Sequence, residues 1–335
     1  MRFHFTRAVL LSLSGALLLV GAGIGWLLHG RFAAASTPTI FREPEGKYHF
    51  ISPLIAFSVG EKSEFTEYAN LERLLRDKIS ALKRAGKIHS TSVYFRDMQS
   101  GHWTGVNEEE LYSPASLYKV ALMIAVLQVA ENEPTLLNER IPFKGSPSAE
   151  APDNPPMEVG RSYAMRELME RLITLSDNDA KDMLRNRIGA GAVSAVFADF
   201  RLAEPALNEV GDTMSARTYS RFFRALYNAT YLSRASSEYA LELLSRVEFK
   251  SGIVNGLTQE ARALPVAHKF GYRVFKDPTD EVTEEIHDCG IIYVPTRPYF
   301  ICVMTKGSQE TDLLDTIQLL SRAVYEEVAK VPASE

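Results

Sequence analysis

The apolar positions along the chain begin with one long uninterrupted run. Ala8–Leu28 spans 21 residues without a charge, and arginines lie on both sides of it. At about 1.5 Å rise per residue, a helix of this length crosses the ~30 Å hydrocarbon core of a bilayer. The small residues of "FAAAS" at 32–36 also suit signal-peptide cleavage. Residues 1–31 are therefore expected to be a transmembrane anchor or a cleaved signal segment.

The flanking charges predict the orientation of this segment. Arg2 and Arg7 precede the run, and Arg31 follows it. Basic residues near a membrane span stay preferentially in the cytoplasm. We therefore expect a cytoplasmic N-terminus and an exported body, in the periplasm or at the cell surface, or secreted if the segment is cleaved. Residues 32–45 are small, contain proline and lack periodicity, which predicts a linker.

The body, residues 46–332, combines strand-like patterns at its two ends with a helical block between them. The ends predict a strand within 47–59, a helix over 67–86 with Gly86 near its C-terminal cap, a hairpin over 91–107, strands over 264–275, 289–294 and 299–304, and a closing helix over 312–330. Apolar residues three and four apart predict further helices over 116–130, 164–175, 179–190, 216–229 and 237–247. This order predicts an α/β (α+β) fold, in which helices flank one sheet and an all-helical lobe at about 116–246 is inserted. A cleft between the lobes is the expected place for a site.

Composition excludes several classes of function. A net charge of −5, a pI near 5.9 and the lack of a basic stripe interleaved with aromatics argue against nucleic-acid binding. Two cysteines provide no Cys/His cluster, so we expect neither a metal nor another cofactor. We also expect a monomer. Cys289 and Cys302 fall on neighbouring strands of one predicted hairpin. Centring its turn on Thr296–Arg297 puts them out of register, so free thiols are expected.

A serine and a lysine one helical turn apart are the first candidates for chemistry. In "YSPASLYKVALM", Ser116 precedes Lys119 by three residues at the head of an apolar run. Free backbone N–H groups at a helix start stabilise an oxyanion, and a desolvated lysine becomes a base that activates a serine. The alternative is the first turn of a buried helix without chemistry. The pattern alone is weakly specific, because "SALK" at 80–83 repeats it on a charged helix.

Three further motifs each have a functional and a purely structural interpretation. "SDN" at 176–178 lies between two predicted helices, where Ser and Asp also serve as helix caps. "HKFGY" at 268–272 places a lysine two residues before a glycine, which lets a substrate approach the strand, although an ordinary strand has the same appearance. "EPALN" at 204–208 puts a carboxylate and an amide in a loop, where they either hold a water or are simply solvated.

Together, S-x-x-K, S-D-N and a strand K-x-G, in this order, resemble the active-site set of class A β-lactamases and penicillin-binding proteins. The resemblance covers roughly residues 46–332. The interval of 60 residues from Ser116 to Ser176 is similar to that of class A enzymes, and "EPALN" resembles their omega-loop motif. The resemblance implies a β-lactamase/transpeptidase-like fold, with a helical lobe against an antiparallel sheet.

The resemblance implies a role in acyl transfer for each motif. Ser116 would be acylated. Lys119 would take its proton, either directly or with Glu204 acting through a water. Ser176 would pass a proton to the leaving amide nitrogen, and Lys269 would supply positive charge beside it.

The remaining implied roles concern substrate binding and hydrolysis. Asn178 would hold the acyl side-chain amide. The backbone N–H groups of Ser116 and Tyr272 would form the oxyanion hole, and Gly271 would let the substrate approach the strand. Glu204 and Asn208 would position the water that hydrolyses the acyl-enzyme.

Three features depart from the family pattern. Phe270 replaces the hydroxyl residue of the usual K-T-G or K-S-G, and Cys289 takes the place of an arginine that reaches the substrate carboxylate in many class A enzymes. Arg273, His287 and Arg297 are candidates to compensate. Only three residues separate Asn208 from Asp212, so the omega loop is short.

These observations favour a class A serine β-lactamase that opens β-lactam rings through an acyl-enzyme on Ser116. A cell-wall D-Ala peptidase or an esterase with the same nucleophile is an alternative, motivated by Phe270 and Cys289. A non-catalytic penicillin-binding-like sensor is another. The expected partner is a small-molecule β-lactam or a cell-wall peptide.

Overall fold

A computed structural model describes residues 40–43, 48–57, 68–145, 155–205, 213–276 and 280–330. All of these residues except Ile40 and Phe57 belong to one compact unit. The predicted membrane segment at 8–28 lies outside the described residues, as does most of the predicted linker. Within the described ranges, none of the helices combines the length and apolar character that a bilayer crossing requires.

The end of the predicted linker is not aperiodic. β1 (Ile40–Arg42) and β2 (Leu54–Phe57) form a two-stranded sheet. The Arg42 guanidinium donates to the carbonyls of Ser52 and Met98 and to Asn228 Oδ1. The strand predicted within 47–59 is thus only the short β2. The sequence pattern did not indicate β1, because the contacts of its Arg42 are with residues far away in the sequence.

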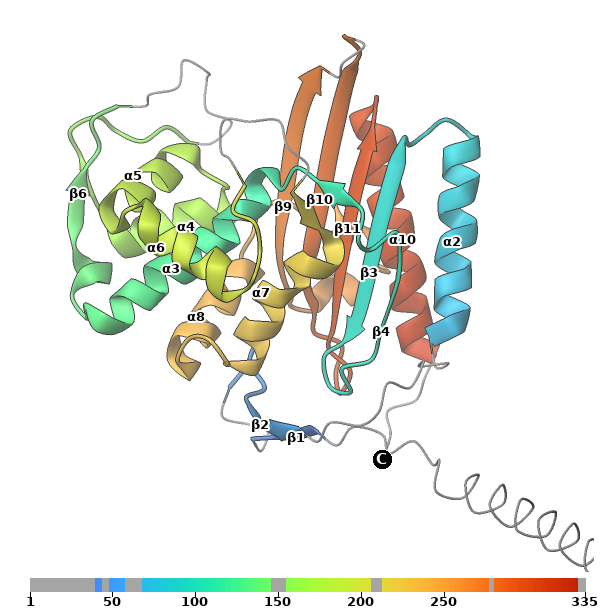
Figure 1. Ribbon diagram of the computed structural model, residues 1–335, viewed down its shortest axis with the longest axis horizontal. Coiled ribbons are helices and arrows are strands. Elements are labelled where there is room, and N and C mark those ends of the chain that lie inside the picture. Colours follow the sequence, from blue (N-terminus) through green and yellow to red (C-terminus); the bar gives the residue numbers. More distant parts are fainter. Residues whose placement is uncertain are drawn as a thin grey trace, which may run out of the picture. The chain divides into compact units, whose positions relative to one another are not determined.

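A five-stranded antiparallel sheet forms the centre of the body (Figure 1). Its strand order is β4-β3-β11-β10-β9, with β3 at Ser90–Asp97, β4 at Trp103–Val106, β9 at Val266–Lys276, β10 at Val282–Ile292 and β11 at Tyr299–Gly307. The hairpin β3–β4 comes from the start of the body and β9–β11 from its end. The predicted sheet built from distant segments is therefore confirmed, and β9 lies at one of its edges.

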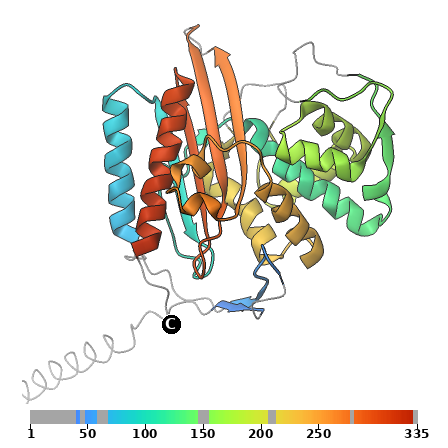
Figure 2. The same cartoon turned by 180° about the vertical axis from the view of Figure 1, so that it is seen from behind.

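Helices cover both faces of this sheet. α2 (Ala69–Arg84) and α10 (Glu310–Lys330) lie side by side behind it (Figure 2). Together with the short α9 (Ile253–Gly256), their apolar residues form one buried cluster with one face of the strands. Gly86 follows α2 with a φ of +71°, the left-handed conformation expected just after a helix end.

The opposite face carries the helical lobe, which has its own apolar core. Its helices are α3 (Tyr118–Asn132), α4 (Met165–Thr174), α5 (Asn178–Ile188), α6 (Ala190–Asp199), α7 (Ala216–Asn228) and α8 (Arg234–Ser245). Short strand pairs β5–β8 (Leu111–Tyr112, Met214–Ser215) and β6–β7 (Arg140–Pro142, Ser162–Ala164) complete it. The sequence pattern missed α6, because glycines at 189 and 191 interrupt the helical signal.

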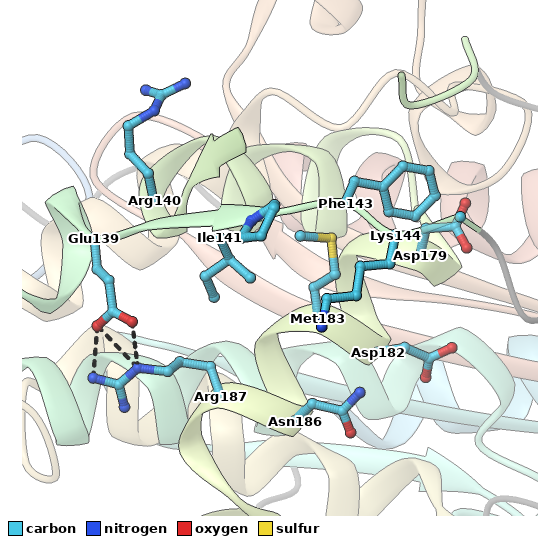
Figure 3. Close-up of a pocket in the computed structure, with 12 residues that line it drawn as sticks. Glu139, Arg140, Ile141, Phe143, Lys144, Asp179, Asp182, Met183, Asn186 and Arg187 are labelled. Carbon is cyan, nitrogen blue, oxygen red and sulfur yellow. Dashed lines mark hydrogen bonds and ion pairs between the residues drawn. The ribbon is translucent and has the colours of Figure 1, made fainter. Parts of the chain in front are cut away.

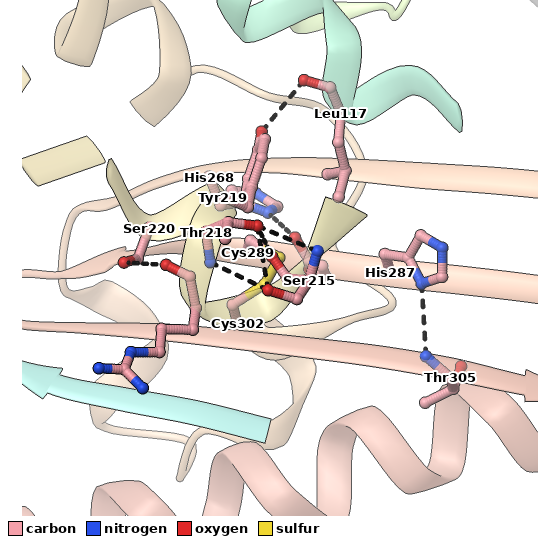
Figure 4. Close-up of a disulfide and its surroundings, with 12 residues drawn as sticks. Leu117, Ser215, Thr218, Tyr219, Ser220, His268, His287, Cys289, Cys302 and Thr305 are labelled. Atoms are coloured by element: carbon pink, nitrogen blue, oxygen red, sulfur yellow. Dashed lines mark hydrogen bonds and ion pairs between the residues drawn. A yellow bond between two sulfur atoms is a disulfide. The ribbon is translucent and has the colours of Figure 1, made fainter. Parts of the chain in front are cut away.

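The two cysteines form a disulfide, so the expectation of free thiols was wrong (Figure 4). Cys289 on β10 and Cys302 on β11 are direct cross-strand partners, and both are fully buried. Ile292 pairs with Tyr299, so the hairpin turn is centred on Pro295–Thr296, one residue earlier than Thr296–Arg297. That small shift changes the register and brings the two sulfurs together.

Removing this disulfide tests its contribution to stability. Cys289→Ala/Cys302→Ala should lower the free energy of unfolding by about 3 kcal/mol, because the bond closes a loop of 13 residues. Chemical denaturation measures the difference, and the reduced parent protein should unfold at nearly the same denaturant concentration as the variant. Alkylation of both cysteines in the denatured, unreduced protein would contradict the bond itself.

Candidate active site

Ser116 lies in a tight 3-10 turn, Ala115–Leu117, that leads directly into α3. Its side chain is half-buried, and the predicted apolar helix behind it is confirmed, with Val120–Leu127 all buried. Ala115 has a φ of +46°, a strained conformation for a residue with a side chain. The buried-helix and functional interpretations are therefore compatible, since the packed helix holds the serine in place.

The edge strand β9 packs directly against this turn. A Cβ at Gly271 would lie 2.9 Å from the Pro114 carbonyl oxygen and 3.3 Å from the Ser116 nitrogen. Only glycine leaves enough room for the strand backbone at this position. The K-x-G motif is thus a point of close backbone contact with the Ser116 turn.

Lys119 is buried beneath the surface and directs its amine to the SDN turn. Its side chain is only 2% exposed. Nζ donates to Asn178 Oδ1 at 2.8 Å, to Ser176 Oγ at 3.1 Å and to the Ser176 carbonyl. Lys119, Ser176 and Asn178, separated by nearly sixty residues in the sequence, therefore form one hydrogen-bonded group.

The SDN turn combines a capping role with a site role. The Asp177 carboxylate accepts hydrogen bonds from the backbone N–H groups of Asp179 and Ala180 and pairs with Arg171 at 2.6 Å. Asp177 is thus the helix cap that the motif also predicted. Ser176 has a φ of +58°, a strained conformation for a residue with a side chain, and its hydroxyl accepts hydrogen bonds from the lysines.

Lys269 reaches the same serine from β9. Its Nζ donates to Ser176 Oγ at 2.9 Å and to the Phe270 carbonyl at 3.1 Å, and the side chain is fully buried. Two lysine amines therefore converge on one hydroxyl, one from the helical lobe and one from the sheet.

This convergence changes the acid–base properties of both lysines. Desolvation, followed by repulsion from Lys181, lowers the pKa of Lys119 to about 7. Desolvation, followed by repulsion from Lys119, lowers the pKa of Lys269 well below its ordinary value. Asp288 offsets part of this effect on Lys269. The amine of Lys119 is consequently neutral in part of the molecules near neutral pH.

Of the three residues considered as compensating carboxylate binders, only Arg273 lies at the site. The Arg273 guanidinium donates to Ser113 Oγ at 2.8 Å, three residues before the candidate nucleophile. As residues i and i+2 of one strand, Gly271 and Arg273 project to the same face. Arg297 instead contacts Asp97 and Tyr68 at the far end of β3.

His287 has a structural role. It is fully buried, its Nε2 lies 2.9 Å from the Ser113 carbonyl, and the Thr305 N–H donates to its Nδ1. Because Nδ1 accepts a hydrogen bond, Nε2 carries the proton and donates to Ser113. His287 therefore holds the chain just before the Ser116 turn. Sequence reasoning missed this role because the contact joins residues 174 positions apart.

Phe270 does not leave a gap where the family hydroxyl would be. Its ring stacks on Phe249, with centroids 4.2 Å apart, and Lys269 Nζ lies 4.1 Å from the Phe270 centroid. Both rings are half-buried. The site wall here is aromatic, and Phe249 is a second member of it that no sequence motif indicated.

The carboxylate of Glu204 has its hydrogen-bond partner outside the lysine group. Glu204 Oε2 accepts a hydrogen bond from Ser194 Oγ of α6, and the described residues show no hydrogen bond between Glu204 and Ser116, Lys119 or Ser176. Asn208 lies outside the described residues. The Tyr272 side chain is 44% exposed and its hydroxyl donates to Glu284, which leaves only its backbone as a site group.

A pocket of about 580 Å³ lies between β6 and α5 (Figure 3). It is bordered by Asp179 and Asp182 on α5 and by an ion pair between Arg187 and Glu139 at 2.7 Å. None of the candidate catalytic residues lines it. Among the described residues, no group of His, Cys, Asp or Glu side chains converges as metal ligands.

Comparisons with known proteins show the family of this chain. The model of a family described as "Beta-lactamase enzyme family" matches residues 74–328. "Beta-lactamase L2" of Stenotrophomonas maltophilia is 26% identical over 206 residues, which cover 58% of this chain and 62% of that protein, less than two thirds of its length.

Solved structures share the fold. "PBP-A" aligns with a TM-score of 0.66 at 22% identity, over 78% of this chain and 97% of its own. A class A β-lactamase from Mycobacterium abscessus aligns with a TM-score of 0.66 at 21% identity, over 76% and 99%. The expected helical lobe on an antiparallel sheet is thereby confirmed, and with the family match over most of its length this chain belongs to the beta-lactamase enzyme family.

Proposed function

We propose that the protein is a serine β-lactamase that opens β-lactam rings through an acyl-enzyme on Ser116. The observation that carries the proposal is the position of the Ser176 hydroxyl between the buried amines of Lys119 and Lys269. A surface lysine keeps its proton at neutral pH, whereas these two are desolvated. Burying two like charges destabilises the fold. A role in proton transfer therefore accounts for the two buried lysines better than a role in stability does.

The proposed acylation step joins this group to Ser116, which lies three residues before Lys119. Ser116 Oγ attacks the lactam carbonyl carbon, and the neutral amine of Lys119 takes its proton. Backbone N–H groups of Ser116 and Tyr272 hold the oxyanion. The ring C–N bond then breaks, and the leaving nitrogen takes a proton through Ser176, which Lys119 and Lys269 contact.

We further propose that Arg273 binds the substrate carboxylate. Cys289 cannot do so, because it is fully buried in a disulfide, and Phe270 offers no hydrogen-bond donor in its side chain. Arg273 lies on the strand that abuts Ser116 and donates to Ser113. A guanidinium at this position replaces part of the lost recognition.

Hydrolysis of the acyl-enzyme is assigned to a water positioned by Glu204, and this is the slow step of the proposed cycle. Glu204 is engaged with Ser194. The water therefore has to bind at Oε1, or replace Ser194 at Oε2, before the carboxylate acts as a base. The same contact favours the second candidate, a D-Ala peptidase or esterase that forms an acyl-enzyme on Ser116 but releases a β-lactam very slowly.

We also propose that the body works outside the cytoplasm. Two observations support this: the uncharged run at Ala8–Leu28 and the disulfide between Cys289 and Cys302. Disulfides persist mainly in oxidising compartments.

A time course of intact mass with benzylpenicillin tests the nucleophile and separates the candidates. The parent protein should gain the mass of one penicillin and return to its free mass when the drug is exhausted. Ser116→Ala should show no adduct. Ser80→Ala is the matched control, because it alters the other S-x-x-K, on α2, and should behave like the parent.

An adduct that persists after the free drug is removed would reject turnover and favour the peptidase or esterase. Acylation of Ser116→Ala, or an unlabelled parent protein, would reject Ser116 as the nucleophile.

The pH dependence of acylation tests Lys119 as the base. Its pKa is lowered to about 7, so the amine is protonated and inactive below this pH and neutral above it. The acylation rate constant should therefore rise about tenfold per pH unit below pH 7 and level off above it. Lys119→Arg should acylate at least a hundredfold more slowly, because a guanidinium stays protonated.

Lys269→Arg is the control for this profile, since it keeps a fixed positive charge beside Ser176 and should retain the rise. A rate constant that is flat between pH 5 and 9 in the parent would contradict the assignment.

Restoring a hydroxyl at position 270 tests substrate recognition. Phe270→Thr should acylate with benzylpenicillin about ten times faster than Phe270→Val, because only threonine donates a hydrogen bond to the carboxylate. Both variants lose the stacking on Phe249, so this comparison cancels the packing loss. Equal second-order acylation rate constants for the two would show that the hydroxyl has no place in this site.

A further inference from the structure

A second polar pocket lies at the other edge of the sheet, where α7 packs against β3 beside the edge strand β4. It has a volume of about 230 Å³. The lining residues are Tyr94, Arg96, Trp103, Glu109, Arg217, Thr218, Ser220, Arg221 and Arg224. Four guanidinium groups thus face one carboxylate. None of the residues assigned to the Ser116 site contributes to it.

The sequence of α7 places three of these arginines on one side. Arg217, Arg221 and Arg224 are spaced by four and three residues, so they lie on the same helix face. Arg96 on β3 pairs in register with Trp103 on β4 and supplies the fourth cation from the sheet. Like charges at this spacing destabilise a helix, so an arrangement of this kind needs a compensating partner.

The protein supplies that compensation to only some of the arginines. Arg217 pairs with Glu109 at 2.8 Å and lies over the Trp103 ring, 4.3 Å from its centroid. Arg221 donates to the carbonyls of Phe200 and Arg201. These contacts fix the two arginines at the rim of the pocket.

Arg224 is the exception. It is half-buried, and the described residues offer it neither a hydrogen bond nor an ion pair. Desolvation and the positive charges of Arg96, Arg221 and Arg217 lower its pKa to about 10, so it is still a cation at neutral pH. A charged group taken partly out of water without a partner is costly. Arg96 is similar, since among the residues that the structure describes its guanidinium donates only to Tyr94 Oη, at 3.5 Å.

We propose that this pocket is an anion-binding site that takes a phosphate group, held by Arg224 and Arg96 and bordered by the Trp103 ring. Guanidinium groups bind phosphate oxygens through paired charge-assisted hydrogen bonds, and two of them converge here from different elements. The pocket volume accommodates a phosphate with a short substituent. The bound group is either a free phosphate compound or the headgroup of an anionic phospholipid.

Trp103 provides a direct reporter for the test. The chain has two tryptophans, so Trp26→Phe leaves Trp103 as the single fluorophore. The full-length protein in this background is titrated with inorganic phosphate and with pyrophosphate at constant ionic strength set by sodium chloride. We expect a saturable fluorescence change with either anion. Arg224→Gln should weaken the apparent affinity ten- to a hundredfold.

Arg73→Gln is the matched control, because Arg73 is an exposed arginine on α2 whose guanidinium donates to Asn70 Oδ1. It should leave the titration unchanged. In phosphate-free buffer, Arg224→Gln should unfold at or above the melting temperature of the parent, since a like charge is removed. If that variant fails to fold, Arg96→Gln carries the same test from the sheet side.

Vesicles distinguish the two sources of phosphate. The parent and Arg224→Gln are sedimented with phosphatidylglycerol vesicles and with phosphatidylcholine vesicles. If Arg224→Gln binds phosphatidylglycerol vesicles less than the parent does, but phosphatidylcholine vesicles equally, the bound group is a lipid headgroup. Binding of soluble phosphate without that difference assigns a free phosphate compound. If neither probe separates Arg224→Gln from the parent, the site is rejected.

Discussion

The contact on which the site depends is the hydrogen bonding of two buried lysines to one serine hydroxyl. Lys119 belongs to the helical lobe and Lys269 to the sheet, while Ser176 lies in a turn between two helices. Desolvation makes each ammonium group expensive, and their proximity adds repulsion. The result is a pair of amines whose pKa values lie below that of an ordinary lysine. Both lobes must be packed together for this property to exist.

Much of the surrounding structure serves to hold that arrangement. The absence of a side chain at Gly271 lets β9 meet the Ser116 turn, and His287 holds the Ser113 carbonyl just before it. The strained backbone at Ala115 and Ser176 lies at the two turns that present the hydroxyls. Strain of this kind persists only where surrounding packing enforces it. Here the buried α3 and the five-stranded sheet supply that packing.

The two edges of the sheet carry opposite solutions to the problem of buried positive charge. At β9, the cations are lysines, whose pKa values fall so that a neutral amine becomes accessible. Beside β4, the cations are arginines of α7 and β3, which stay charged whatever their surroundings. The first arrangement suits proton transfer. The arginine arrangement suits the binding of an anion. At the lysine site, the aromatic wall of Phe270 and Phe249 adds a constraint on which substrates fit.

The sequence by itself determined the order of the elements and the identity of the motifs, because helical and strand periodicity and the spacing of Ser116, Lys119, Ser176 and Lys269 are local features of the chain. It also indicated where the family pattern is broken, at Phe270 and Cys289. It could not determine the hairpin register, in which moving the centre of the turn by one residue makes Cys289 and Cys302 direct partners. Nor could it place the contacts of His287 and Glu204, or the position of Arg224 among other arginines, since each depends on residues brought together by packing. Only the tertiary structure decided these contacts, because burial and distance, which set the charge states and the bonds, are properties of the assembled lobes.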